Sequence, residues 1–321
     1  MDVIISHESA LEYWRLHGSA NIDTAARLRR KTLPTSLPDI FDIRAKIPPD
    51  LSYPINLMVN SPNARRRSKT IRPHVCTASI PDWSFTNIGG GIAVSTPAFC
   101  YFQMAGELPP IKLIELGYEL CGSYSLAAVN EYTPGLEAAD KTSYGHPPLT
   151  NTKALRNFAA RMEGVNGQKN AHRALRYVAD RSASPMETIL VMLLTLPNKL
   201  GGCGLPVPEL NKRIDMGKGV LKKSDKSYYV CDLFWPEANL AVEYDSDFYH
   251  TGANRIANDS KKRLDLAVLG IDVITVTRRQ VRNALEFENL ARLIARTLGK
   301  RLRYGMPQLL KAQHELRSLL L

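Results

Sequence analysis

The sequence predicts an α/β (α+β) protein: a C-terminal domain with a central mixed sheet flanked by helices, and a smaller α+β module before it. The first observation behind this prediction is the order of helical and β-type segments between residues 182 and 300, which is α, β, β, α, β, α. The second is a set of short β-type runs between residues 55 and 94, separated by Pro, Asn and Gly and followed by helical segments. A chain of 321 residues has room for both parts.

The N-terminal module is expected to span residues 1–150. It begins with an amphipathic segment and a basic, helix-like stretch containing Arg27, Arg29, Arg30 and Lys31, followed by proline-rich sequence. The β-type runs lie at 55–59, 74–76 and 92–94. A helix is expected after Ser95 and Thr96, with Pro97 in its first turn, and another at 109–120. Residues 122–148 are typical of a long loop.

Residues 151–181 are expected to form a helical connector, because 153–162 and 170–178 both have helical periodicity. The third part, 182–321, opens on a capping pattern with Ser184 as N-cap, Pro185 in the first helical position and Glu187 three residues after the cap. Strands follow at 228–235 and 240–245, then a helix at 259–269 that ends at Gly270. A β-type run at 271–277 and a helix at 286–298 complete it.

Three carboxylates are predicted to lie on one surface of the hairpin. If residues 236–239 form a four-residue turn, Trp235 pairs with Leu240 and Asp232 falls opposite Glu243. Asp245 shares a face with Glu243, because side chains alternate along a strand. Like charges this close repel one another, and a hard divalent cation with oxygen ligands relieves the repulsion. An alternative stays open: Asp232 and Glu243 are an exposed cross-strand pair held by a lysine or arginine.

The composition limits which partners the protein can bind and in which cellular compartment it is expected. The net charge of +11 favours a polyanionic partner, with nucleic acid the first candidate. The five cysteines are odd in number and lack CxxC spacing, which argues against a zinc ribbon or a disulfide framework and fits a reducing cytoplasm. No apolar run approaches the roughly 20 residues of a membrane span, and the N-terminus lacks a signal-peptide pattern. We therefore expect a cytoplasmic protein with no membrane partner.

An ordered set of motifs resembles a known domain. The set begins with the Ser184 to Glu187 pattern and continues with Cys231-Asp-Leu-Phe-Trp235, Val242-Glu-Tyr-Asp245, Tyr249-His250, Asp259-x-x-x-Arg263 and Gly270-Ile-Asp-Val-Ile274. Over residues 182–300 it resembles the very-short-patch-repair-like endonuclease domain of the PD-(D/E)XK superfamily, which has a restriction-endonuclease-like fold. Residues 55–122 more weakly resemble the middle of proteins related to AbiEi, the antitoxin of a type IV toxin–antitoxin system.

The first resemblance implies a deoxyribonuclease that hydrolyses phosphodiester bonds of DNA with Mg²⁺ or Mn²⁺, in phage defence or a toxin–antitoxin context. In that case Asp232 and Glu243 hold the metal, and Asp245 binds the same ion or orients the attacking water. His250 acts as general base or as leaving-group acid. Glu187 corresponds to the acidic residue of the first helix and completes the outer shell of the metal. Lys262 and Arg263 are placed to contact phosphate.

The chain departs from the superfamily pattern in one respect. Where a standard site has Glu-x-Lys, this chain has Asp245 instead of the lysine, so the mechanism of lysine-bearing nucleases does not transfer directly. The resembling group usually has glycine after this aspartate, whereas this chain has Ser246 followed by Asp247.

Basic clusters are candidate nucleic-acid contacts. Arg65, Arg66 and Arg67 lie between two predicted strands, where an exposed loop could follow a phosphate backbone or simply be solvated. Arg278 and Arg279 follow the last predicted strand, where a DNA-binding rim could form. Three individual alternatives also stay open: Glu187 as a plain capping-box residue, His250 bonded to a backbone carbonyl, and Asp259 with Arg263 as an i, i+4 ion pair on the helix surface.

A non-enzymatic function is the alternative for the whole chain. In it, the protein is a DNA-binding antitoxin or transcriptional regulator whose nuclease fold is degenerate and serves as a scaffold. Its partners would be DNA and, by the AbiEi resemblance, a cognate toxin or other protein.

Overall fold

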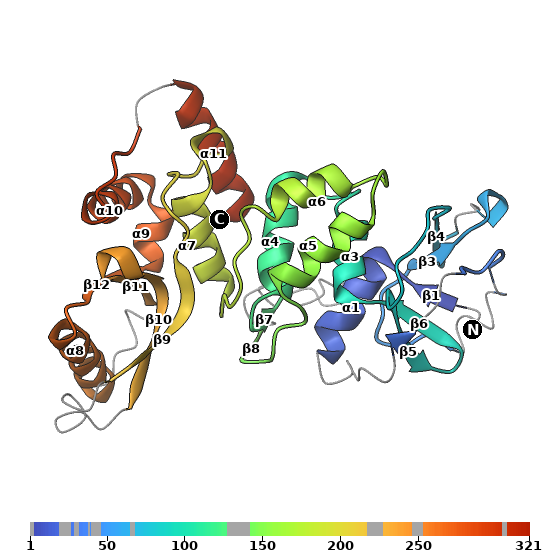
Figure 1. The fold of residues 1–321 in the computed structure, drawn as a ribbon, viewed down its shortest axis with the longest axis horizontal. Helices are drawn as coiled ribbons and strands as arrows, with labels where there is room; N and C mark the ends of the chain where they lie inside the picture. The colour runs from blue at the N-terminus through green and yellow to red at the C-terminus, as the bar shows by residue number, and fades with distance from the viewer. Residues whose placement is uncertain are drawn as a thin grey trace. The chain divides into compact units, whose positions relative to one another are not determined.

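The chain folds into two compact units, residues 1–180 and 181–321, in a computed structural model drawn in Figure 1. The structure describes residues 3–18, 27–28, 32–37, 39, 46–64, 68–126, 142–216, 227–245, 253–303 and 307–321. Both units combine helices with strands, and both main sheets mix parallel and antiparallel pairing, so the predicted α+β class is confirmed.

Unit 1 is built on a six-stranded sheet with the strand order β2-β5-β6-β1-β3-β4. The strands are β1 (Val3–Ile5), β2 (Arg27–Leu28), β3 (Ile55–Val59), β4 (Ile71–Val75), β5 (Phe85–Gly89) and β6 (Ile92–Ser95). β1 runs parallel to β6 and antiparallel to β3, and all three residues of β1 are buried. Only apolar residues fill these central positions, because side chains there are covered on both faces.

The helices of unit 1 gather beside this sheet, as Figure 1 shows. They are α1 (His7–His17), α3 (Pro97–Met104), α4 (Pro110–Leu120), α5 (Thr152–Arg161) and α6 (Gln168–Ala174). α1 packs against α3, β3 and β6, and its Trp14 is fully buried, with Nε1 donating to the Ser95 carbonyl at 2.7 Å. A short pair of strands, β7 (Tyr124–Ser125) and β8 (Ser143–Tyr144), lies outside the main sheet.

Three sequence expectations for unit 1 need comment. The basic stretch around Arg27 begins as a strand rather than a helix, because Arg27 and Leu28 pair with Thr86 and Phe85 of β5. The helix after Thr96 is present with Pro97 as its first residue, but Thr96 makes no side-chain capping bond. The helices expected as a connector over 151–181 lie within unit 1, where α5 packs on α3 and α6 on α4.

Unit 2 is built on a four-stranded sheet with the order β12-β11-β10-β9. The strands are β9 (Glu209–Asp215), β10 (Tyr228–Trp235), β11 (Leu240–Asp245) and β12 (Asp272–Thr277). β10 is antiparallel to both of its neighbours, and β11 and β12 are parallel, joined by a crossover through a helix. The sheet is therefore mixed, as the order of segments predicts.

The helices of unit 2 flank this sheet. They are α7 (Pro185–Thr195), α8 (Ala253–Val268), α9 (Arg278–Arg282), α10 (Ala284–Thr297) and α11 (Pro307–Leu320). α7 contacts β10, and α8 buries Leu266 against Tyr229, Cys231 and Ala241 of the sheet. At its C-terminus α8 gives way to Gly270, whose φ of 74° lies in the left-handed region that favours glycine.

Among the helices that the structure describes, none combines the length and the apolar character needed to cross a membrane.

Candidate functional site

The candidate site of unit 2 starts from the hairpin of β10 and β11. Residues Pro236–Ala238 form one 3₁₀ turn, and Asn239 closes it in the left-handed conformation with φ of 46°. Trp235 pairs with Leu240 and Leu233 with Val242, so the register predicted from the four-residue turn is confirmed. One step further, the Tyr244 amide donates to Asp232 Oδ2 at 2.8 Å. The Asp232 side chain thus accepts a hydrogen bond from the backbone of the neighbouring strand, one residue after Glu243.

Glu243 is held from the neighbouring helix. Lys262 of α8 donates from Nζ to Glu243 Oε2 at 2.7 Å and to the Val230 carbonyl at 2.7 Å. Both side chains are largely covered, with 23% of Lys262 and 17% of Glu243 exposed. The second oxygen of Glu243, Oε1, is buried, and none of the residues that the structure describes donates a hydrogen bond to it. The pair therefore neutralises one carboxylate and leaves one of its oxygens open to a further donor or cation.

Glu187 reaches the same cluster from the start of α7. Ser184 caps this helix by accepting from the Glu187 amide at 3.1 Å, as the capping pattern predicts. Glu187 Oε2 accepts from the Ala183 amide at 2.9 Å and from Asn211 Nδ2 at 2.7 Å. Glu187 is 7% exposed, so it has a structural role at the helix start and also adds negative charge to the interior.

The pKa values show that these carboxylates affect one another. The pKa of Asp232 is raised to about 7, first by burial, then by the charges of Glu243 and Glu187, against the opposing effect of the Tyr244 amide and Lys262. Burial, with a further contribution from Glu243, also raises the pKa of Glu187. The Cys231 thiol has a pKa of about 12 because it is buried and lies next to Glu243. The carboxylates of Glu187, Asp232 and Glu243 thus create a region of negative potential, which the positive charge of Lys262 partly offsets.

Asp245 stands at the end of β11, paired with Thr277 of β12, where α9 begins. The carboxylates of unit 2 are coupled electrostatically, but their oxygens are not arranged as a compact ligand set. Within the described parts of the chain, the group of three His, Cys, Asp or Glu side chains whose ligand atoms all lie within 4.8 Å is in unit 1: His7, His74 and Glu107.

The remaining predicted site residues divide into two sets. Arg65, Arg66, Arg67 and His250 lie outside the described residues, as do Ser246 and Asp247. Arg263 of α8 and Arg278 of α9 are exposed, and Arg279 is exposed while it pairs with Glu286 at 2.8 Å. Lys262, expected to contact phosphate, is bonded to Glu243 instead of standing free. The alternative that a lysine holds the carboxylate pair thus applies to Glu243, although this lysine comes from a helix rather than from a strand.

Sequence reasoning missed the groups that complete these contacts. Asn211 of β9 has a φ of 45° and directs its side chain to Glu187, and the Tyr244 amide binds Asp232. Neither contact has a local sequence signal, because each depends on how β9, β10 and α7 meet in space. The histidine group of unit 1 was missed for the same reason.

Comparison with known proteins adds two relatives. The chain is 28% identical over 146 residues to Uncharacterized protein MT2308 of Mycobacterium tuberculosis strain CDC 1551 / Oshkosh, and to Uncharacterized protein Rv2248 of strain ATCC 25618 / H37Rv. The match covers 46% of this chain and 48% of each relative, so the chain spans about half the length of the curated relatives that it matches. No family model matches the chain. No solved structure matches it either.

Proposed function

We propose that unit 2 is a metal-dependent nuclease-like domain that hydrolyses DNA phosphodiester bonds. The observation that carries the proposal is the electrostatic coupling of Glu187, Asp232 and Glu243, in which the pKa of Asp232 is raised to about 7 by burial and by its two acidic neighbours. Perturbed pKa values of this kind concentrate at functional sites. The ordered motif resemblance of residues 182–300 to the very-short-patch-repair-like endonuclease domain supports the same function.

The residues supply the negative charge that a hard divalent cation would balance, although their oxygens do not form a compact ligand set. Glu243 Oε1 is a buried acceptor that receives no hydrogen bond from the described residues, and the carboxylates repel one another in a poorly solvated interior. Carboxylate oxygens are the ligands that Mg²⁺ and Mn²⁺ prefer. Asp232 and Glu243 would hold the ion, and Asp245, the last residue of the strand that carries Glu243, would bind it or orient the water. When bound, the ion supplies positive charge to the non-bridging phosphate oxygens and lowers the pKa of a water.

The side chains of the protein have their own parts in this chemistry. Lys262 places a positive charge next to Glu243. When the carboxylate binds a cation, the ammonium group of Lys262 can turn to contact a phosphate instead. Asp232, whose pKa is about 7 without an ion, would release its proton when a cation binds. The exposed Arg263, Arg278 and Arg279 can contact the DNA backbone and make affinity depend on salt.

A second function is favoured by a specific observation. Asp232, Glu243 and Glu187 each accept a hydrogen bond from within the protein, so the cluster is partly satisfied with no ion. This favours a DNA-binding regulator that keeps the fold as a scaffold, with DNA and a cognate toxin as partners. Such a protein would bind DNA without a divalent metal.

Cleavage of supercoiled plasmid by the full chain, with MgCl₂ or MnCl₂, tests the first function. Asp232→Asn and Glu243→Gln keep the side-chain shape while removing charge, and we expect each to lower the cleavage rate about 100-fold or more. Glu209→Gln is the matched control, because Glu209 is an exposed carboxylate of the same sheet that pairs with Lys212. It should cleave like the wild type.

Two results would overturn the nuclease proposal. One is cleavage by Asp232→Asn and Glu243→Gln at the wild-type rate, which would point to a contaminant. The other is no cleavage in either metal together with salt-dependent, metal-free DNA binding in a gel-shift assay, which supports the regulator.

A further inference from the structure

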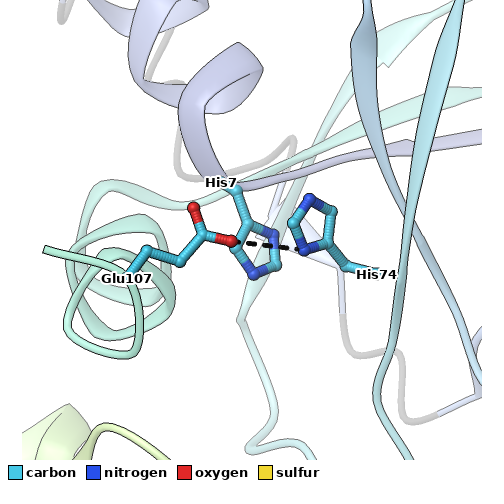
Figure 2. A group of neighbouring side chains, drawn as sticks. All are labelled: His7, His74 and Glu107. Atoms are coloured by element: carbon cyan, nitrogen blue, oxygen red, sulfur yellow. Dashed lines mark ion pairs between the residues drawn. The ribbon is translucent and has the colours of Figure 1, made fainter.

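A second cluster of ionisable groups lies in unit 1 and takes no part in the proposed nuclease site. His7 is the first residue of α1, His74 belongs to β4, and Glu107 lies in the turn between α3 and α4. Figure 2 shows the carboxylate of Glu107 directed toward the two histidine rings. The rings are stacked, with centroids 3.5 Å apart and planes inclined by 17°, and His74 Nδ1 lies 3.6 Å from Glu107 Oε1.

The hydrogen bonds of His74 fix which of its nitrogens carries a proton. The amide group of Asn56 donates from Nδ2 to Ser9 Oγ at 3.1 Å, with the Pro54 carbonyl also within reach. Asn56 Oδ1 therefore faces His74 Nε2, at 2.8 Å, and an oxygen there can only accept. The neutral His74 ring is thus protonated at Nε2, and its lone pair is on Nδ1, the nitrogen next to Glu107. This is the arrangement by which outer-shell partners orient a metal-binding histidine.

His7 is oriented in a similar way by Ser6. The Ser6 hydroxyl donates to the Asn56 carbonyl at 3.4 Å, which leaves its oxygen as acceptor for His7 Nδ1 at 3.0 Å. With Nδ1–H donating to Ser6, the neutral His7 ring carries its lone pair on Nε2. Burial lowers the pKa of this ring and so favours the neutral form. Neutral imidazole is the form that binds metals.

His7 has a strained backbone conformation, which hydrogen bonds from a neighbouring helix hold in place. Its φ is 51°, in the left-handed region that a histidine seldom adopts. The helix α3 fixes it from two sides, because Gln103 Oε1 accepts from the His7 amide at 3.0 Å and the Cys100 thiol donates to the His7 carbonyl at 3.3 Å. Strained residues that the surroundings hold firmly are concentrated at functional sites.

We propose that His7, His74 and Glu107 form a binding site for a divalent transition-metal cation, with Zn²⁺ the ion that best fits two imidazoles and one carboxylate. One ligand atom from each residue lies within 4.8 Å of the others. The ring centroids lie 3.5 Å apart, so both imidazoles are within reach of one ion. Because the rings are stacked, one of them rotates on binding to direct its lone pair at the ion.

Three protein ligands would leave a tetrahedral ion one further position, and the Glu107 side chain is 31% exposed. Open sites of this kind bind a water or a small ligand, unlike closed structural zinc sites with four protein ligands. Arg72 opposes an added cation, since its charge already acts on His7. The bound ion would tie together α1, β4 and the α3–α4 turn.

Calorimetric titration of the EDTA-stripped full chain with ZnCl₂ tests the site, with CoCl₂ as a spectroscopic probe. We expect one high-affinity equivalent and a visible Co²⁺ absorption typical of tetrahedral nitrogen and oxygen ligation. His74→Ala and Glu107→Gln should each weaken binding at least about tenfold, and Arg72→Gln should strengthen it. His172→Ala is the matched control, because His172 is an exposed histidine of the same unit; it should bind like the wild type.

The test separates this site from the carboxylates of unit 2. Zn²⁺ binding should persist in Asp232→Asn and should not be displaced by excess MgCl₂, because imidazole favours transition metals over Mg²⁺. Glu107 lies in a turn and its side chain is partly exposed, so Glu107→Gln should fold even if His74→Ala does not. The proposal is wrong if the wild type binds no Zn²⁺, or if Glu107→Gln and His74→Ala bind it as tightly as the wild type.

Discussion

The carboxylate cluster of unit 2 and the histidine cluster of unit 1 each bring together side chains from three separate segments, but they balance charge in different ways. In unit 2, the ammonium group of Lys262 already occupies one oxygen of Glu243, at 2.7 Å. In unit 1, Asn56 and Ser6 accept ring protons from His74 and His7, and both rings lie next to the Glu107 carboxylate. A cation entering unit 2 therefore competes with a lysine, whereas one entering unit 1 meets two hydrogen-bonded imidazoles and a carboxylate, and needs one ring to rotate.

Removing Lys262 should have the largest effect on the difference in stability between the two units. Lys262→Met leaves the mostly buried Glu243 beside Asp232 and Glu187 with no opposing charge, which should destabilise unit 2 by about 2 kcal/mol, or roughly 6 °C in Tm. Excess MgCl₂ should restore more stability to the variant than to the wild type, because the ion no longer competes with Lys262. Scanning calorimetry with EDTA or MgCl₂ measures both effects.

Lys212→Met is the control for that experiment. Lys212 pairs with Glu209 at the same distance of 2.7 Å, but both side chains are well exposed, so the change should stay within about 0.5 kcal/mol. Equal Tm values for Lys262→Met and Lys212→Met would mean that the carboxylates of unit 2 do not share a region of negative potential.

The pH dependence of unit 2 should follow from Asp232, with a somewhat smaller effect. Its pKa in the folded protein, about 7, lies above the value of about 3.9 in an unfolded chain, so the folded state binds more protons between these values. Without metal, the contribution of Asp232 to stability is therefore fully present below pH 4 and is lost as the pH rises through 7. Asp232→Asn does not titrate and keeps an oxygen for the Tyr244 amide.

We expect the Tm of Asp232→Asn, measured in EDTA, to rise relative to that of the wild type by at least roughly 3 °C between pH 4 and pH 8. Asp215→Asn serves as the control, because Asp215 is an exposed carboxylate at the end of β9. A wild-type Tm that rises relative to Asp232→Asn over this range would contradict the raised pKa.

The parts of this molecule that the sequence predicts are those fixed by neighbours in the chain. The hairpin register follows from Pro236 and Asn239, which set the turn, and the start of α7 follows from Ser184 and Pro185. The strand β9 was missed because Glu209–Asp215 is rich in charged residues and is a strand only by pairing with β10. The strand β1 was missed because three residues carry no readable periodicity.

The sites were less predictable than the fold. The carboxylates could be placed near one another from strand alternation, but the partner of Glu243 depends on how α8 packs over the sheet. His7 and His74 come from a helix start and a strand edge, with no motif spacing between them. The sheet order, which places β3 between β1 and β4, brings them together. Contacts of this kind depend on tertiary structure, which local patterns do not specify.

The smallest predicted effect concerns the helix cap that positions Glu187. Ser184→Ala removes the bond to the Glu187 amide and should cost about 1 kcal/mol, since an N-cap hydroxyl satisfies an otherwise open donor. Asn151 caps α5 of unit 1 by the same geometry, accepting from the Ala154 amide at 2.9 Å, so Asn151→Ala is the matched change in the other unit. Hydrogen exchange measured by mass spectrometry should rise in the first turn of α7 for Ser184→Ala, and in the first turn of α5 for Asn151→Ala.

Because Glu187 helps to raise the pKa of Asp232, a loosened cap should also weaken the pH dependence of unit 2, which Asn151→Ala should leave unchanged. An unchanged pH dependence in Ser184→Ala, with faster exchange at α7, would mean that Glu187 acts at the helix start alone and adds nothing to the carboxylate cluster.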